Sequence, residues 1–259
     1  MLRVGSFWTV KRKPPVRTVG CALLVLASCA ARPGGTSRWR GYDAAAFASG
    51  QRWLERARDV RGKTPWAAGI MACLRDATSG QVLEGRGGMA VAPGRAVRII
   101  LLMAGGPTLL DVWVTPDRWR VAVPVRGTVE RGTEDVRADL PVSFLRRWFL
   151  HPFEGTLVAV SASGAEPGML VRDGEAVLEI RVGRCDGGDL TRTIRRIRDR
   201  EVERIDECLA PGGPRPGNWA RYVNSAGGLS ADVTFESVSV VIPDESAFVE
   251  PETTGLSRE

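Results

Sequence analysis

Residues able to do acid–base chemistry lie close together near the middle of the chain. Four carboxylates, Glu130, Glu134, Asp135 and Asp139, fall within residues 130–139. Two carboxylates can divide the roles of general acid and general base, but this spacing holds no two of them on one face, and it predicts a solvated loop. The single histidine, His151, ends an apolar segment, where it would interact with a helix dipole. One histidine cannot form a zinc triad, so we predict no catalytic residue, no metal and no cofactor.

Two other segments resemble phosphate-binding loops but lack the structural context of such loops. Residues 57–64 begin with Ala57 where the loop needs glycine, and they end a predicted helix instead of following a strand. Residues 85–90 fit the pattern G-x-G-x-x-A, but Pro93 and Gly94 prevent a helix from opening after them. Neither segment is therefore expected to bind a nucleotide.

The cysteine with the clearest predicted chemistry is Cys29. It follows a basic leader and a short apolar core, which is the arrangement of a secretory signal peptide and is too short to span a bilayer. Residues 26–29, Leu-Ala-Ser-Cys, resemble a bacterial lipobox, which implies cleavage after residue 28 and acylation of Cys29. Residues 1–28 are accordingly assigned to the signal peptide, and residues 29–41 to the acylated cysteine and a flexible tether. The alternative is an ordinary signal peptide in which Cys29 has no special role.

The basic character of the chain comes from this leader. The whole sequence carries 36 Lys and Arg residues and 30 Asp and Glu residues, a net charge of +6. Residues 1–28 hold five of the basic residues and none of the acidic ones, so the rest of the chain has a net charge of +1. A nearly neutral chain offers no positive field to a polyanion, and we expect no nucleic-acid partner.

Three further cysteines, Cys73, Cys185 and Cys208, belong to the predicted mature chain. An oxidising compartment permits one disulfide. Cys185 with Cys208 is the favoured pair, although sequence leaves the other pairings open. No Cys-x-x-Cys spacing indicates a structural zinc site.

The elements that must position these residues are mostly short strands. Asp43 can cap a helix over residues 44–60, and Pro141 can open a second, strongly apolar helix that ends at Pro152. Residues 190–209 nearly fit a helix, but we predict two strands because Val and Ile recur there. The predicted helices and strands together form one domain over residues 42–250, followed by a disordered tail at 251–259. The predicted strands cover residues 67–75, 81–85, 97–103, 109–115, 119–124, 156–161, 169–171, 176–182, 191–198, 202–208 and 230–242.

Two of these pieces together resemble the LolA/LolB-like superfamily. One is the meander at residues 97–124, which has a Gly/Pro turn between apolar strands and runs into Pro-Asp-Arg-Trp at 116–119. The other is the segment at residues 140–150, which has the pattern Pro-x-x-x-Leu-Arg-x-Trp. The resemblance implies a mainly β protein with short helices. Its fold would be an unclosed antiparallel β-barrel, or half-barrel, with a helical plug over an apolar cavity that holds acyl chains.

The resemblance also implies partners and a location. The partners would be acyl chains of lipids or lipoproteins, a periplasmic LolA-like carrier, and the membrane that holds the anchor. Because alanines instead of aspartate follow Cys29, the implied location is the periplasmic face of the outer membrane. The turn at residues 104–107 lacks the large apolar tip of the corresponding loop in the family's receptors. The candidate lining residues of the acyl cavity are Leu101, Met103, Leu110, Val112, Trp113, Trp119, Phe144, Leu145, Trp148 and Phe149.

Two other interpretations remain open at the level of sequence. The same apolar residues could pack the sheet against its helix, which would give a non-catalytic envelope-assembly or interaction lipoprotein without an open cavity. A secreted enzyme with a carboxylate site is the third possibility.

The lipobox makes a direct prediction about the anchor. Replacing Cys29 with alanine should abolish acylation and release the protein from the membrane fraction, since the thiol is the attachment atom. Mass spectrometry and fractionation of the mature protein would measure both effects. A Cys29→Ala variant that is still acylated would contradict the lipobox.

Overall fold

The computed structural model describes residues 43–62, 64–133, 142–161, 168–210, 213–239 and 243–251. The predicted signal peptide, Cys29, the tether, and Glu134, Asp135 and Asp139 lie outside these residues, as do residues 252–259 of the predicted tail.

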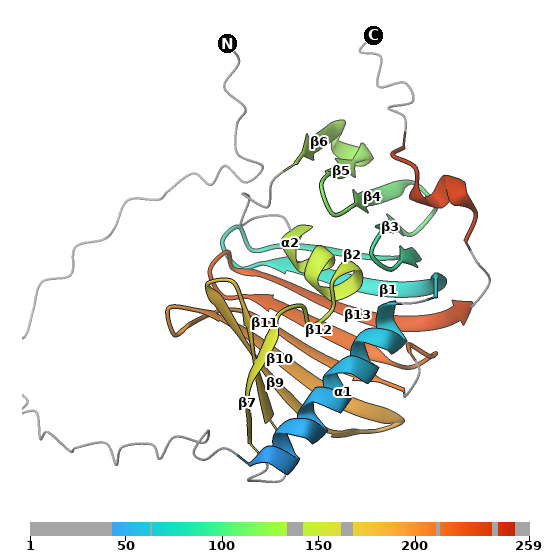
Figure 1. Ribbon diagram of the computed structural model, residues 1–259. Coiled ribbons are helices and arrows are strands. Elements are labelled where there is room, and N and C mark those ends of the chain that lie inside the picture. The colour runs from blue at the N-terminus through green and yellow to red at the C-terminus, as the bar shows by residue number, and fades with distance from the viewer. Residues whose placement is uncertain are drawn as a thin grey trace, which may run out of the picture.

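All thirteen strands of the described residues belong to one antiparallel sheet (Figure 1). The spatial order is β6-β5-β4-β3-β2-β1-β13-β12-β11-β10-β9-β8-β7, so β6 and β7 form the two edges and the sheet does not close. This confirms the predicted mainly β, unclosed half-barrel. The strands are β1 (Trp66–Asp76), β2 (Gln81–Ala92), β3 (Ala96–Leu102), β4 (Thr108–Val114), β5 (Trp119–Val123), β6 (Thr128–Gly132), β7 (Thr156–Ser161), β8 (Gly168–Asp173), β9 (Ala176–Cys185), β10 (Gly188–Ile197), β11 (Arg200–Leu209), β12 (Trp219–Asn224) and β13 (Leu229–Ser239).

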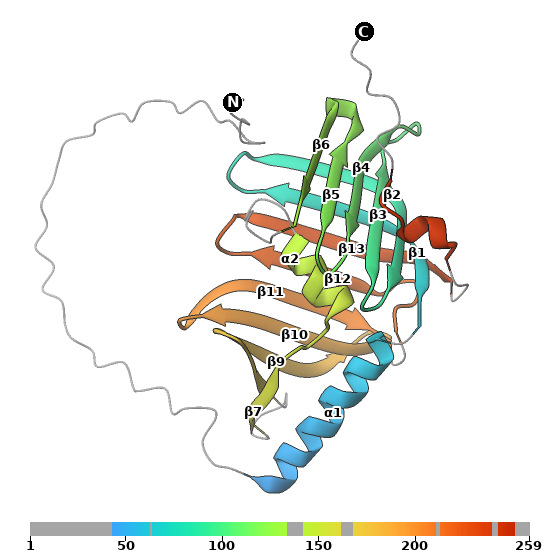
Figure 2. The same cartoon turned by 45° about the horizontal axis from the view of Figure 1, so that its top comes forward.

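The helices lie on the inner, concave face of the sheet (Figures 1 and 2). Helix α1 (Ala44–Gly62) begins at its predicted cap, because the Asp43 carboxylate accepts hydrogen bonds from the amides of Ala45 and Ala46 at 2.9 and 3.1 Å. The second helix starts as α2 (Val142–Leu145) and continues directly as the π-helical turn η2 (Arg146–Leu150). Two short 3₁₀ turns, η1 (Pro124–Arg126) and η3 (Glu245–Phe248), complete the described helical elements.

All eleven predicted strands are present, some of them longer than predicted, and two further strands were not predicted. Residues 190–209 form β10 and β11, as the β-branched composition indicated. The segment 85–90 lies inside β2, which is longer than predicted, and residues 57–62 end α1. β6 and β12 were not predicted from the sequence, because strands of five and six residues are too short to show a clear hydrophobic periodicity.

The sheet bends sharply between β2 and β3, so that β3–β6 stand steeply against β1 and β13 in Figure 2. Two glycines on β2 permit the bend. A Cβ added at Gly85 would lie 2.7 Å from the carbonyl oxygen of Leu102, and one added at Gly87 would overlap the carbonyl oxygen of Ile100. Only glycine allows such close backbone approach at a strand corner.

Two hydrophobic clusters form on the inner face. The larger one packs β1–β5, β12 and β13 against α2 and η2, and includes Ile70, Val112 and Phe144. The smaller one packs α1 on β7–β9 through Leu54 and Ile180. Helix α1, and α2 together with η2, therefore cover different parts of the concave face.

The corner glycine gives a testable consequence for stability. Gly87→Ala should lower the free energy of unfolding by about 1–3 kcal/mol, the usual range for overpacking, because its Cβ would collide with the β3 backbone. Gly88→Ala is the matched control, since the nearest atom to its added Cβ is the carbonyl oxygen of Ala68 at 3.9 Å. Urea unfolding of both variants measures the difference, and equal stability would show that the corner does not need glycine.

Candidate functional site

A large hollow lies between the C-terminal half of α1, η2 and the inner face of the sheet. Its volume is about 500 Å³, within the range of small-molecule sites. One wall is apolar and strongly aromatic, formed mainly by Trp53, Trp66, Val91, Trp148, Phe149, Leu209, Phe235 and Val238. The polar residues that border the hollow are Arg56, Arg61, Thr64, Asp189 and Thr191.

Aromatic contacts hold the apolar wall in shape. The ring of Trp66 on β1 meets Phe149 edge to face at a centroid distance of 6.0 Å and Phe235 on β13 at 6.1 Å. Trp148 packs on Phe149 at 4.3 Å. These geometries are favourable beyond the area that they bury, and they join η2 to two strands far apart in sequence.

A buried carboxylate beside the hollow ties both helices to the sheet. Glu207 on β11 is only 1% exposed, accepts a hydrogen bond from the Trp148 indole nitrogen at 2.7 Å, and forms an ion pair with Arg61 of α1. A buried charge is tolerated only when it is paired and hydrogen-bonded, so Glu207 fixes where α1 and η2 meet.

A second carboxylate on the same face of β11, Glu203, also has an arginine and a hydrogen-bond donor as partners. Glu203 forms an ion pair with Arg147 of η2 and accepts a hydrogen bond from the Tyr222 hydroxyl at 3.1 Å. Burial, and then the neighbouring charge of Glu203, raise the pKa of Tyr222 well above its ordinary value. Tyr222 therefore stays a neutral donor throughout the physiological pH range.

Both carboxylates have two partners. Glu203 and Glu207 each form an ion pair with an arginine and accept a hydrogen bond from a second donor. In the described part of the chain, no group of His, Cys, Asp and Glu residues could hold a metal ion. His151 directly follows η2, and its imidazole lies 3.9 Å from the Glu154 carboxylate. No helix among the described residues is long and apolar enough to span a bilayer.

Two of the ten predicted lining residues, Trp148 and Phe149, line this cavity. Six others belong to the packed core between the N-terminal strands and α2, where neighbours fill the space around them. Phe144, for example, stacks on Tyr222 at a centroid distance of 3.9 Å. The cavity described above therefore lies beside η2, and eight of the ten predicted residues are not among its lining residues. The six core residues are Leu101, Leu110, Val112, Trp119, Phe144 and Leu145.

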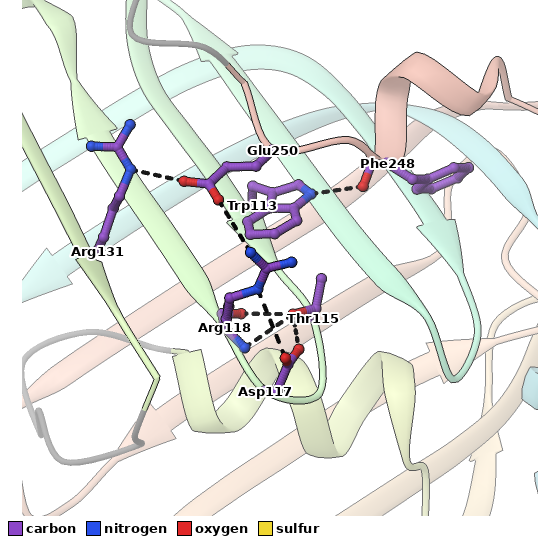
Figure 3. A network of polar contacts seen from close by, with 7 residues as sticks. All are labelled: Trp113, Thr115, Asp117, Arg118, Arg131, Phe248 and Glu250. Carbon is purple, nitrogen blue, oxygen red and sulfur yellow. Dashed lines mark hydrogen bonds and ion pairs between the residues drawn. The ribbon is translucent and has the colours of Figure 1, made fainter.

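The remaining two candidates lie away from the cavity. Trp113 faces the outer side of the sheet, where its indole nitrogen donates a hydrogen bond to the Phe248 carbonyl oxygen at 3.0 Å (Figure 3). Met103 follows β3 at a turn and is 42% exposed. Strand alternation explains Trp113, because its neighbour Val112 takes the inner position.

The lining residues Trp53, Trp66 and Phe235 were not predicted from the sequence. The alternation of Leu229, Ala231, Val233 and Phe235 along β13 was a readable signal for one buried face. Nothing in that pattern shows that β13 pairs with β1, whose residues precede it by more than 150 positions.

The predicted disulfide between Cys185 and Cys208 is present. Cys185 at the end of β9 and Cys208 on β11 are joined by a disulfide, with 6.0 Å between their Cα atoms. Cys73 is a free, half-buried thiol on β1. The disulfide thus links strands that flank β10.

Fold and cavity together define a class: an open β half-barrel whose inner face holds helices and a residual apolar hollow. No protein-family model matches the chain, and a search of the curated proteins gave no match.

Similar solved structures include three that cover most of this chain. A DUF1329 family protein from Desulfovibrio piger has 11% identity, covers 79% of this chain and 98% of its own, and has a TM-score of 0.46. A putative outer membrane lipoprotein-sorting protein domain from Vibrio parahaemolyticus has 11% identity, coverages of 72% and 91%, and a TM-score of 0.44. A LolA superfamily protein from Nitrosomonas europaea has 10% identity, coverages of 77% and 97%, and a TM-score of 0.39. A protein of the superfamily that the sequence resembles is thus among these neighbours.

The buried ion pair makes a prediction for stability. Glu207→Gln should lower the free energy of unfolding by about 3 kcal/mol, because it leaves the Arg61 guanidinium without its counter-charge in a buried setting. Glu201→Gln on the same strand is the control. Its carboxylate lies 4.0 Å from Arg204 in a more exposed pair, so the expected change is within about 0.5 kcal/mol. Equal effects in thermal or urea unfolding would show that Glu207 does not hold the helices.

Proposed function

We propose that this protein binds acyl chains in the cavity between α1, η2 and the sheet, and acts as a lipid-binding envelope lipoprotein of the LolA/LolB type. The observation that carries the proposal is the hollow of about 500 Å³ between the helices and the sheet, whose wall holds five aromatic side chains. The proposal assigns no catalytic step.

The physical basis is the hydrophobic effect. Each methylene of an acyl chain removed from water contributes about 0.8 kcal/mol, so a chain of ordinary length gains enough from an apolar wall to stay bound. The polar border, with Arg56, Arg61 and Thr191, suits the end of a lipid that carries oxygen atoms. An amphipathic ligand therefore fits this site better than a wholly apolar one.

The anchor and the location extend the proposal on sequence grounds. Acylation at Cys29 would hold the domain at the membrane through a tether of about a dozen residues, and the alanines that follow Cys29 favour the periplasmic face of the outer membrane. A periplasmic LolA-like carrier would then be the partner that delivers acylated cargo.

A second candidate function also has support. On the meander side, the protein's own side chains fill the inner face, and Trp119, Phe144 and Leu145 are all buried. An envelope-assembly lipoprotein on the same scaffold would need only this packed core. Its cavity would not retain lipid.

The decisive measurement is lipid content. Residues 30–259, purified without detergent, should yield bound lipid on extraction and mass spectrometry, or bind a fluorescent fatty-acyl probe saturably. A domain that is empty and also ignores the probe would contradict acyl binding and favour the second candidate.

A pair of valine variants tests the position of the ligand. Val238→Glu places a carboxylate in the apolar wall and should weaken probe binding at least tenfold, which is about 1.4 kcal/mol. Val82→Glu is the control, because Val82 is an exposed strand valine remote from the lining residues. If both variants bind the probe equally, the ligand does not occupy this cavity.

A further inference from the structure

A short segment covers the outer face of the sheet opposite the helices. We call residues 243–251, which include η3, the C-terminal strap; it crosses β2–β4 toward β6 (Figures 2 and 3). In the described structure the strap pairs with no strand, and its own backbone hydrogen bond, from Ala247 to Asp244, is local. It could therefore leave the sheet without breaking a β ladder.

One aromatic side chain anchors the strap. Phe248 is 5% exposed and packs against Ala90, Ala92 and Ala96. The Arg95 guanidinium lies over its ring, 5.6 Å from the centroid. Small alanine side chains on β2 and β3 leave the room that this ring occupies.

A single backbone contact fixes the anchor in register. The indole nitrogen of Trp113 donates to the carbonyl oxygen of Phe248 at 3.0 Å, as Figure 3 shows. The guanidinium of Arg118 in turn lies 5.7 Å from the Trp113 ring centroid. Any extended peptide offers such a carbonyl, so this contact does not depend on the strap's own sequence.

Two carboxylates flank the anchor and meet arginines of the sheet. Glu245, three residues before Phe248, pairs with Arg95. Glu250, two residues after it, accepts from Arg131 at 2.8 Å and lies 3.9 Å from Arg118 (Figure 3). The surface thus contacts a carboxylate, an aromatic ring and a second carboxylate in sequence along the strap.

These charge contacts are of the kind that exchanges readily. The side chains of the Arg95–Glu245 pair are 54% and 70% exposed, so solvent and salt screen the attraction. With the strap removed, Trp113 and the three alanines would face solvent between Arg95, Arg118 and Arg131. We call this surface beneath the strap the outer-face groove. Its aromatic and basic side chains are complementary to an acidic peptide with an aromatic residue.

We propose that this outer-face groove is a docking site for a partner protein's acidic peptide, extended and carrying an aromatic residue between carboxylates, and that the C-terminal strap occupies the groove in cis until such a peptide replaces it. This proposal is independent of acyl binding, because the groove lies on the opposite face of the sheet from the cavity. It gives the protein one face for lipid and one for a protein partner.

The test uses a fluorescent synthetic peptide of residues 244–251 and the full chain carrying Phe248→Ala, which loosens the strap. The peptide should bind this variant saturably and at least tenfold more tightly than it binds the unaltered chain, and added salt should weaken the binding. A peptide with alanine at the phenylalanine position should bind at least tenfold more weakly. Absence of binding to a folded Phe248→Ala chain, or equal binding of both peptides, would overturn the proposal.

Exchanging the charges of the groove and the peptide distinguishes specific recognition from non-specific binding. Arg95→Glu and Arg131→Glu, added to the Phe248→Ala chain, should abolish binding of the natural peptide. A peptide with arginine in place of Glu245 and Glu250 should restore it. Both arginine positions are substantially exposed, so the fold should persist, and circular dichroism would check this. Failure of the exchanged peptide to bind the folded, charge-reversed chain would contradict the proposed pairing.

Discussion

The structure depends on one constraint: an unclosed sheet leaves its apolar concave face open, and other parts of the chain must cover it. A closed barrel would fill its interior from its own strands, but here β6 and β7 stay apart as edges. Helix α1 covers β7–β9 and α2 with η2 cover the N-terminal strands. The helix α1 and the turn η2 leave space between them, and the cavity lies at this position.

The polar groups of the concave face decide where those covers sit. Glu203 and Glu207 lie on one face of β11 and reach Arg147 and Arg61 on different helical elements. An apolar contact would allow a helix to slide, whereas a buried charge pair has one favourable geometry. The carboxylates therefore position Trp148 at the cavity wall, so the cavity wall and the polar network are parts of one arrangement.

The outer face of the sheet is stabilised by different interactions from the inner face. It is held by exposed or half-exposed arginine–carboxylate pairs and, over β2–β4, by the C-terminal strap. Partial burial alone would raise the pKa of Asp232, but hydrogen bonds from Arg221 and Arg75 lower it overall. Such a surface gains little stability from each pair and is suited to contacts that form and break.

The sequence by itself determined the local elements and the class of fold. The Asp43 cap, the Pro141 helix and the alternating apolar strands predicted α1, α2 with η2, and a β-rich half-barrel, because capping and side-chain periodicity act over only a few residues. Tertiary structure alone decided which apolar residues are core and which line a cavity. Trp148 and Phe149 were found because they lie on the predicted helix, whereas Trp66 and Phe235 were not, since the pairing of β1 with β13 brings together residues distant in sequence. Trp113 shows the same limit, because a side chain's type does not tell which face of a two-sided sheet it occupies; only the register and the covering strap determine that.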